Sequence, residues 1–284
     1  MGSRLIAAIV ASAWASPVLA QPPPPAPVPI TAAVESTSYP LALTERPLLM
    51  PAGGFELFGI LALGLQEIGG LDGPETLETV VMKPGIRYGI GSAEVAAGLD
   101  LLVHQGEIEG VMFTNDDPLT RLFAGARFEV SPELAVGGEL AITGPTTDFK
   151  VFSPRATLAN KQHFGRGAVE LGVAAGLDHR PAQDMFELPS RQAMVLAGQL
   201  RVQGQVTPVV AVEARATMTY FNVLDDDEGE LESSPSYFVQ QSYGLRALGS
   251  VTPDLDVIGE FEVLASGEGN YKIVSIGVAY RRVP

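Results

Sequence analysis

Charged side chains share one face of a two-residue repeat in many short segments of this chain, and apolar side chains share the other face. Between residues 94 and 104, Glu94 and Asp100 fall on one side of a two-residue repeat, and valines and leucines fall on the other. A period of two is typical of a β-strand whose faces meet different surroundings. Carboxylates and guanidinium groups gathered on one such face offer mutual ion pairing or a charged wall along which ions pass.

The same alternation assigns a larger set of charged residues to the face opposite the apolar one. The basic members are Lys83, Arg87, Arg121, Arg127, Arg155, Arg191, Arg201, Arg215 and Arg246. The acidic members are Glu56, Glu94, Asp100, Glu139, Glu170, Glu213, Asp256, Glu260 and Glu262. Because the signs nearly balance, neighbouring strands can pair arginine with glutamate. Such pairs either fill a narrow interior or line a water-filled path whose charge sets ion preference.

The apolar faces indicate strands that cross a lipid bilayer. The segments are about ten residues long, which is the length a tilted membrane strand needs, and a bare charge on the lipid side would cost several kcal/mol. The sequence therefore predicts an all-β fold, a transmembrane antiparallel up-and-down β-barrel of about 12 strands. The predicted strands are residues 55–66, 79–90, 94–104, 119–130, 134–143, 149–159, 166–178, 191–203, 209–221, 237–249, 255–265 and 271–281.

The connections between these segments alternate in length. Short turns at 91–92, 131–133 and 252–254 alternate with longer polar loops at 105–118, 179–189 and 223–236. Outer-membrane barrels have short periplasmic turns and longer outer loops. A glycine- and acid-containing connection is expected at 69–75. The exception to the alternation is a longer link at 160–165 on the side of the short turns.

A repeat of roughly 40 residues is also compatible with propeller blades, so a propeller or a soluble sandwich is the alternative fold. The Gly-His and Trp-Asp signals of such blades do not occur in a blade-like pattern, since the one tryptophan is Trp14.

Composition narrows the partners and cofactors. The 284 residues carry a formal net charge of −15, which argues against nucleic acid as a partner because phosphate binding needs a basic surface. There is no cysteine, so a disulfide framework and a thiolate metal site are excluded. The acidic run at 225–232 is interpreted as a solvated loop rather than a metal site, and no cofactor is expected.

The N-terminal region divides into two predicted parts ahead of the barrel. Residues 1–20 have a basic start, a short apolar middle and a small residue at the end, which predicts a secretory signal peptide. Residues 21–53 begin with a proline-dense stretch and are predicted to be a periplasmic linker. Residues 54–284 form the predicted barrel. We therefore expect the cell outer membrane, with outer-membrane lipid, the barrel assembly machinery and a small solute as partners.

Two stretches resemble a group of proteobacterial outer-membrane barrels. One is Tyr-Pro-Leu-Ala-Leu-Thr-Glu-Arg-Pro-Leu-Leu-Met-Pro-Ala-Gly-Gly-Phe-Glu at 39–56, and the other is residues 84–94, with Arg-Tyr-Gly, a tight turn and Glu-Val. The group includes barrels regarded as transporters of the phenol meta-cleavage pathway. The resemblance implies a barrel and the uptake of small molecules. One departure is the C-terminus, where such barrels usually end on an aromatic residue and this chain ends Tyr280-Arg-Arg-Val-Pro.

Three functional hypotheses follow. The first is a passive channel or transporter for small solutes. The second is a closed barrel with a structural or surface-interaction role through acidic outer loops. The third is an outer-membrane hydrolase using His179, next to Asp178, with Ser190. A serine, a base and an orienting group must converge for hydrolysis. The sequence offers no motif that brings them together, so we expect no enzyme.

Overall fold

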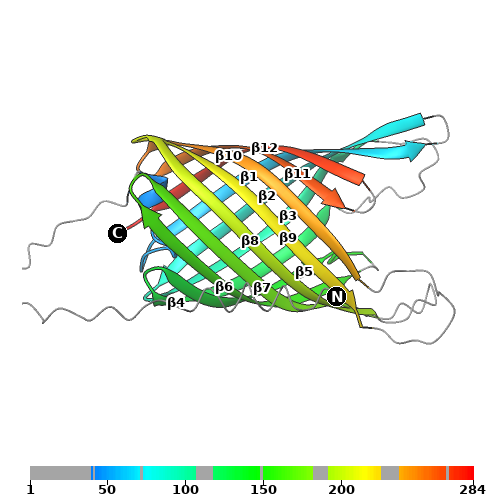
Figure 1. Ribbon diagram of the computed structural model, residues 1–284, viewed down its shortest axis with the longest axis horizontal. Coiled ribbons are helices and arrows are strands. Elements are labelled where there is room, and N and C mark those ends of the chain that lie inside the picture. The colour runs from blue at the N-terminus through cyan, green and yellow to red at the C-terminus, as the bar shows by residue number, and fades with distance from the viewer. Residues whose placement is uncertain are drawn as a thin grey trace, which may run out of the picture. The chain divides into compact units, whose positions relative to one another are not determined.

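The chain forms a closed antiparallel β-barrel of twelve strands in this computed structural model (Figure 1). The structure describes residue 40 and residues 42–70, 73–106, 118–147, 150–181, 191–224, 237–266 and 269–284. Each strand pairs with its neighbours in sequence, and β1 pairs with β12 to close the ring. The strands are β1 (Phe55–Gly70), β2 (Gly73–Ile90), β3 (Ala93–Gln105), β4 (Leu119–Ser131), β5 (Leu134–Thr143), β6 (Val151–Phe164), β7 (Gly167–Arg180), β8 (Arg191–Thr207), β9 (Val210–Val223), β10 (Tyr237–Thr252), β11 (Leu255–Ser266) and β12 (Gly269–Arg282).

One short 3-10 helix, η1 (Leu43–Glu45), precedes the strands. Within the described ranges, no helix is both long enough and apolar enough to cross a membrane.

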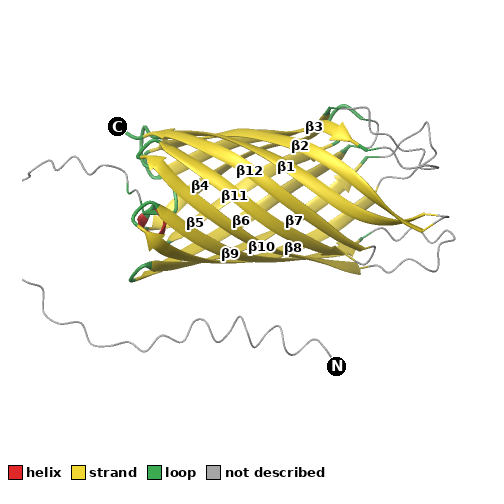
Figure 2. Cartoon of the chain, turned by 90° about the horizontal axis from the view of Figure 1, so that it is seen from above, coloured by secondary structure: helices red, strands yellow, loops and turns green. Residues whose placement is uncertain are grey.

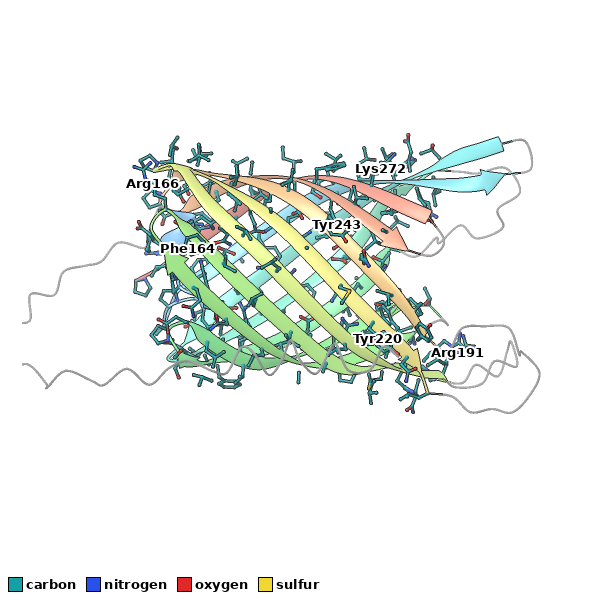
Figure 3. All side chains as sticks on the ribbon, in the orientation of Figure 1. Phe164, Arg166, Arg191, Tyr220, Tyr243 and Lys272 are labelled. Atoms are coloured by element: carbon teal, nitrogen blue, oxygen red, sulfur yellow. The ribbon has the colours of Figure 1, made fainter. Side chains whose placement is uncertain are left out.

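Alternate residues of the strands point away from the interior, and many of these outward residues are apolar, so the outer surface of the barrel is apolar. Leu245 on β10 is 65% exposed and Ile276 on β12 is 63% exposed. Figure 3 shows side chains projecting outward along the length of the barrel. Such a large contiguous apolar surface is unfavourable in water and suits the hydrocarbon core of a lipid bilayer. The predicted transmembrane antiparallel barrel of 12 strands is confirmed, and the propeller and sandwich alternatives are wrong.

The strands are longer than predicted where polar residues and glycines suggested loops. The predicted connection at 69–75 is wrong, because β1 continues to Gly70 and β2 begins at Gly73, with these two residues paired. This hairpin extends beyond the neighbouring strand ends (Figure 1, cyan). Backbone pairing continues through it because a ladder of N–H and C=O groups does not depend on side-chain polarity.

The predicted longer link at 160–165 is also wrong. β6 runs to Phe164, and the turn is only Gly165 and Arg166, with Gly165 in the left-handed region at φ +56°. The polar stretch before it pairs in register, since Lys161 lies opposite Glu170 on β7. Lys161 is buried, so the polar residue that suggested a loop is an inward-facing strand residue.

The short turns of the described chain lie at one end of the barrel, called here the turn end. They are residues 91–92, 132–133, 165–166, 208–209 and 253–254. β1 starts and β12 ends there, and Figure 2 shows the C-terminus and η1 at the same end. The longer predicted loops at 105–118, 179–189 and 223–236 lie mostly outside the described residues.

We predict that a charge on the outer face of β12 destabilises the barrel, and that the same charge one residue earlier does not. Ile276→Arg places a guanidinium group in hydrocarbon near mid-strand, which costs about 2–4 kcal/mol. Ser275→Arg is the matched control, because residue 275 faces inward opposite Glu260. Urea titration of the barrel refolded in phosphatidylcholine vesicles, followed by its heat-dependent gel mobility, measures both. Equal stability of the two variants would contradict the assigned faces.

Candidate functional site

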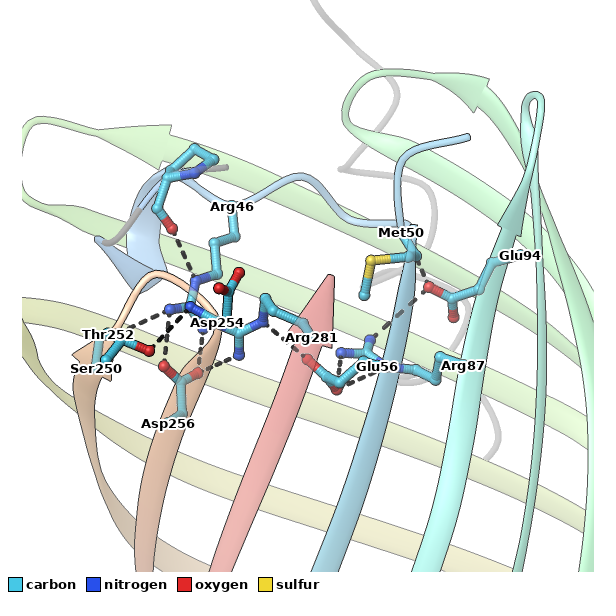
Figure 4. Close-up of polar contacts among 11 residues, drawn as sticks. Arg46, Met50, Glu56, Arg87, Glu94, Ser250, Thr252, Asp254, Asp256 and Arg281 are labelled. Carbon is cyan, nitrogen blue, oxygen red and sulfur yellow. Dashed lines mark hydrogen bonds and ion pairs between the residues drawn. The ribbon is translucent and has the colours of Figure 1, made fainter. Parts of the chain in front are cut away.

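Residues 42–53, called here the strap, lie inside the barrel at the turn end (Figure 4). Arg46 binds Asp256 on β11 and Ser250 on β10, with 2.5 Å between Arg46 Nη1 and Asp256 Oδ2. From the other side of the ring, Lys161 on β6 donates to the backbone carbonyl of Arg46 at 2.9 Å. The first half of the strap is therefore fixed to two distant parts of the wall.

The second half of the strap is fixed to a third part of the wall. Leu48 and Leu49 are buried and cluster with Ala135 on β5. The backbone N–H of Met50 donates to Glu94 on β3 at 2.8 Å. Because β5 and β11 are opposite one another in the ring, the strap crosses the lumen and narrows it. Residues 42–53 were predicted as the end of a linker, and the structure places them against the barrel wall.

A chain of ion pairs joins the strap to the point where β1 and β12 meet. Arg281 on β12 lies between two carboxylates, donating from Nε to Glu56 on β1 at 3.2 Å and pairing with Asp256 through Nη2. Arg87 on β2 binds the other oxygen of Glu56 at 2.5 Å. Since Asp256 also binds Arg46, the first strand, the last strands and the strap share one network (Figure 4).

Glu94 extends this network to β4. Its Oε1 accepts from Arg127 Nη2 at 2.5 Å, and its Oε2 accepts from the Met50 N–H. Glu94 is 1% exposed, so this carboxylate depends on its partners for the interactions that water would otherwise supply. Removing one partner of a buried ion pair generally costs about 3–5 kcal/mol, because the other charge remains buried.

The backbone of the strap lies against Gly89 on β2. The Gly53 N–H donates to the Gly89 carbonyl at 2.9 Å, and the Gly89 N–H donates to Gly54 at 2.9 Å. A Cβ at residue 89 would lie 2.1 Å from the carbonyl oxygen of Pro51 and 2.4 Å from that of Met50. Only glycine permits this approach, so Gly89 is part of the seat of the strap.

A cavity of about 450 Å³ lies in the lumen against β2 to β9, and it adjoins the space beneath the strap. Four arginines from alternate strands line it, namely Arg87, Arg127, Arg155 and Arg201. Three carboxylates also line it, namely Glu94, Glu139 and Glu170. Most of the remaining lining consists of glycine, alanine and threonine, including Ala96, Gly125, Gly138, Thr157, Gly172, Ala197 and Thr217. Small inward side chains leave this part of the interior hollow.

The wall on the side of β9 to β11 holds a second cluster of ion pairs. Arg215 binds Glu260 and also Glu262, the latter at 2.7 Å. Arg246 binds Glu260 at 2.8 Å and lies 3.8 Å from Glu213. Two guanidinium groups, on β9 and β10, bind the three carboxylates, and the Arg215 side chain reaches across β10 to Glu260 and Glu262 on β11. This cluster therefore acts as bracing of the wall.

Exposed apolar neighbours show that two of the predicted charged residues, Arg87 and Arg201, face inward. Arg87 lies between exposed Ile86 and Tyr88, and Arg201 lies between exposed Leu200 and Val202. Seven of the predicted residues line the cavity, namely Arg87, Glu94, Arg127, Glu139, Arg155, Glu170 and Arg201. Glu213 and Arg246 line the space beneath the strap.

The other predicted residues occupy different places. Arg121 pairs with Glu139 at 3.0 Å, and its guanidinium carbon lies 5.3 Å from the centre of the Phe123 ring. Lys83 and Asp100 are half-buried strand residues, and Arg191 is exposed at the first position of β8. A role of the predicted residues in conduction stays a prediction.

The sequence reasoning missed Arg46, Lys161 and Arg281. The alternation of inward and outward residues could have identified two of them. Lys161 shares the inward parity of Arg155 on β6, and Arg281 shares that of Ala279 on β12. Arg46 precedes the strands, where alternation gives no information.

The hydrolase hypothesis meets an obstacle in β7. Asp178 and His179 are consecutive strand residues, so their side chains point to opposite faces. Asp178 accepts a hydrogen bond from Arg155 at 3.3 Å. Ser190 and the acidic run at 225–232 lie outside the described residues.

Solved structures share this fold at low sequence identity. An outer membrane channel from Pseudomonas putida F1 has a TM-score of 0.59 and 12% identity, covering 83% of this chain and 97% of that one. The NanC porin has a TM-score of 0.50 and 10% identity, covering 78% and 98%. The beta domain of a Bordetella autotransporter has a TM-score of 0.50 and 11% identity, covering 81% and 99%.

These likenesses show that the chain has the fold of outer-membrane β-barrels. No protein-family model matches the sequence, and no curated protein matches it. Channels and an autotransporter domain appear among the similar structures, so the fold by itself leaves the activity to be argued from the interior.

We predict that Gly89→Ala displaces the strap. The chain has no cysteine, so Met50→Cys introduces a single thiol at a site that is 3% exposed. In that background, Gly89→Ala should raise the rate of maleimide labelling about tenfold or more, which corresponds to about 1.4 kcal/mol in the opening equilibrium. Gly59→Ala is the control, since a Cβ there meets nothing within 4 Å. Equal labelling in the two variants would show that the strap does not depend on this contact.

Proposed function

We propose that this protein is a passive outer-membrane channel for small solutes, with a strap that narrows its periplasmic mouth. The observation that carries the proposal is the hollow interior, a cavity of about 450 Å³ lined by charged and small side chains inside an apolar cylinder. A barrel that served only as a membrane anchor would have no need of a charged cavity, because large side chains fill a closed interior more economically. Charged side chains facing a water-filled path set ion preference.

The short turns support an orientation. Outer-membrane barrels place short turns in the periplasm, so the turn end, with both ends of the barrel chain and the strap, faces the periplasm in this proposal. Tyr280 lies near the end of β12 with its side chain on the lipid side, where the assembly machinery would read an aromatic residue. Outer-membrane lipid covers the apolar exterior.

We also propose membership of the barrel group that includes meta-cleavage pathway transporters. Two stretches, at 39–56 and 84–94, carry the resemblance. They meet in the fold, because the first contains the strap and the second contains Gly89 and Glu94, which hold it. A strap and strap-binding residues in common with that group would explain why the resemblance is confined to these two stretches.

The buried strap also favours a second candidate, a closed barrel. Leu48 and Leu49 are buried within the mouth, and a fixed plug would leave a structural or surface-interaction role. The two candidates differ in whether ions pass.

Planar-bilayer recording of the full barrel separates them. We predict small current steps for the wild type and several-fold larger steps for Arg46→Ala, which removes the strap's hold on Asp256 and Ser250. Glu45→Gln is the control, because Glu45 is an exposed strap residue and the change removes a charge without removing that hold. If neither wild type nor Arg46→Ala gives current steps at any voltage, the channel is excluded and the closed barrel stands.

A further inference from the structure

The arginines and carboxylates that line the cavity against β2 to β9 differ in how far they are exposed to it. The side chains of Arg87, Arg127 and Arg201 are 30–32% exposed, whereas their partners Glu94 and Glu170 are 1% and 13% exposed. Glu94 and Glu170 lie back against the wall with guanidinium groups in front of them, whereas Glu139 is 37% exposed and pairs with Arg121 at 3.0 Å. Four arginines and three carboxylates line the cavity, and two of the carboxylates are covered, so positive charge predominates at its surface within a chain whose net charge is −15.

Two of these arginines hold their carboxylates loosely. Arg155 reaches Asp178 at 3.3 Å and Arg201 reaches Glu170 at 3.3 Å, whereas the Arg127–Glu94 pair is at 2.5 Å. The Nε groups of Arg155 and Arg201 are buried and have no hydrogen-bond partner among the described residues. Because both Nε atoms are buried, a ligand in the cavity meets the terminal N–H groups of these guanidinium groups, whose side chains are 28% and 30% exposed, and charge-assisted hydrogen bonds to an oxyanion form there.

The cavity has room for the organic part of such a ligand. Its lining is otherwise small, and Phe123 adds one apolar face. The Phe123 ring lies over Gly98, where a Cβ would be 2.5 Å from the ring. A volume of about 450 Å³ is within the range of small-molecule sites, about 300–1,000 Å³.

We propose that this cavity is a binding site for small organic anions, which makes the channel anion-selective despite the acidic chain. This inference rests on the proposed channel function. Arg155 and Arg201 donate to the carboxylate of the ligand, Arg87 and Arg127 supply positive potential, and Phe123 contacts its hydrocarbon part. The low dielectric of the surrounding wall and bilayer strengthens the potential at the site and raises the local concentration of anions.

Two measurements on the full barrel test the site. The first is the reversal potential in a tenfold KCl gradient, where we expect chloride to be preferred over potassium in the wild type. In Arg155→Gln/Arg201→Gln, the chloride-to-potassium permeability ratio should fall by about threefold or more, because two inward charges are lost. Arg155→Lys/Arg201→Lys should keep most of the preference. Arg166→Gln/Arg282→Gln, which removes two exposed arginines from the turn end, should leave the ratio unchanged.

The second is calorimetric titration of the detergent-solubilised barrel with sodium butyrate, which needs no current. Butyrate should bind the wild type, and affinity should fall about tenfold or more in the glutamine double variant, in line with the loss of charge-assisted hydrogen bonds. Heat-dependent gel mobility confirms that each variant is folded.

The outcomes separate the two proposals. Butyrate binding without any current would keep the site and remove the channel. A wild-type current that prefers potassium would overturn the anion site and keep the channel. The same conclusion would follow if the glutamine double variant left the chloride-to-potassium permeability ratio unchanged. Failure of butyrate to bind the folded wild type would also overturn the site.

Discussion

Closure of the ring between β1 and β12 is the constraint on which the rest of the structure depends. In hydrocarbon, an unpaired backbone N–H or C=O group costs several kcal/mol, so a sheet can span a bilayer only without edges. The seam is paired from Phe55 opposite Arg282 to Gln66 opposite Tyr271. Glu56 and Arg281 are direct partners in this ladder, and their side chains also bind one another. The charge network that holds the strap is therefore built on the seam itself.

The sequence predicted the strands and their faces because one side of every strand meets the same apolar solvent. Ile86 and Tyr88 around Arg87 were sufficient to point that arginine inward. The sequence did not predict which charged residues pair, because pairing depends on the register between neighbouring strands. Arg127 meets Glu94 since those residues are opposite in the β3–β4 ladder, and a shift of one residue would separate them. The same limit applies to Lys161, whose polar neighbours suggested a loop.

The strap was beyond prediction for a different reason. Arg46 lies in a segment without periodicity, and its partner Asp256 is 210 residues away in sequence. Likewise, nothing local indicates that Gly89 must lack a side chain because the strap backbone lies against it. The charge at the surface of the cavity could not be predicted from the sequence either, because it depends on how the side chains are arranged in three dimensions. Four arginines and three carboxylates line the cavity, and its surface is more positive than these numbers indicate, because Glu94 and Glu170 lie close to the wall and longer arginine side chains extend over them.

The strap also has a mechanical consequence. It is continuous with the chain that precedes Pro40, and its attachments follow one another in sequence, Arg46 to Asp256, then Met50 to Glu94, then Gly53 to Gly89. Tension on the preceding chain loads these bonds one after another, as in peeling, rather than all together, as in shear. The wall differs from the strap in this respect, because its strands share a load along entire ladders.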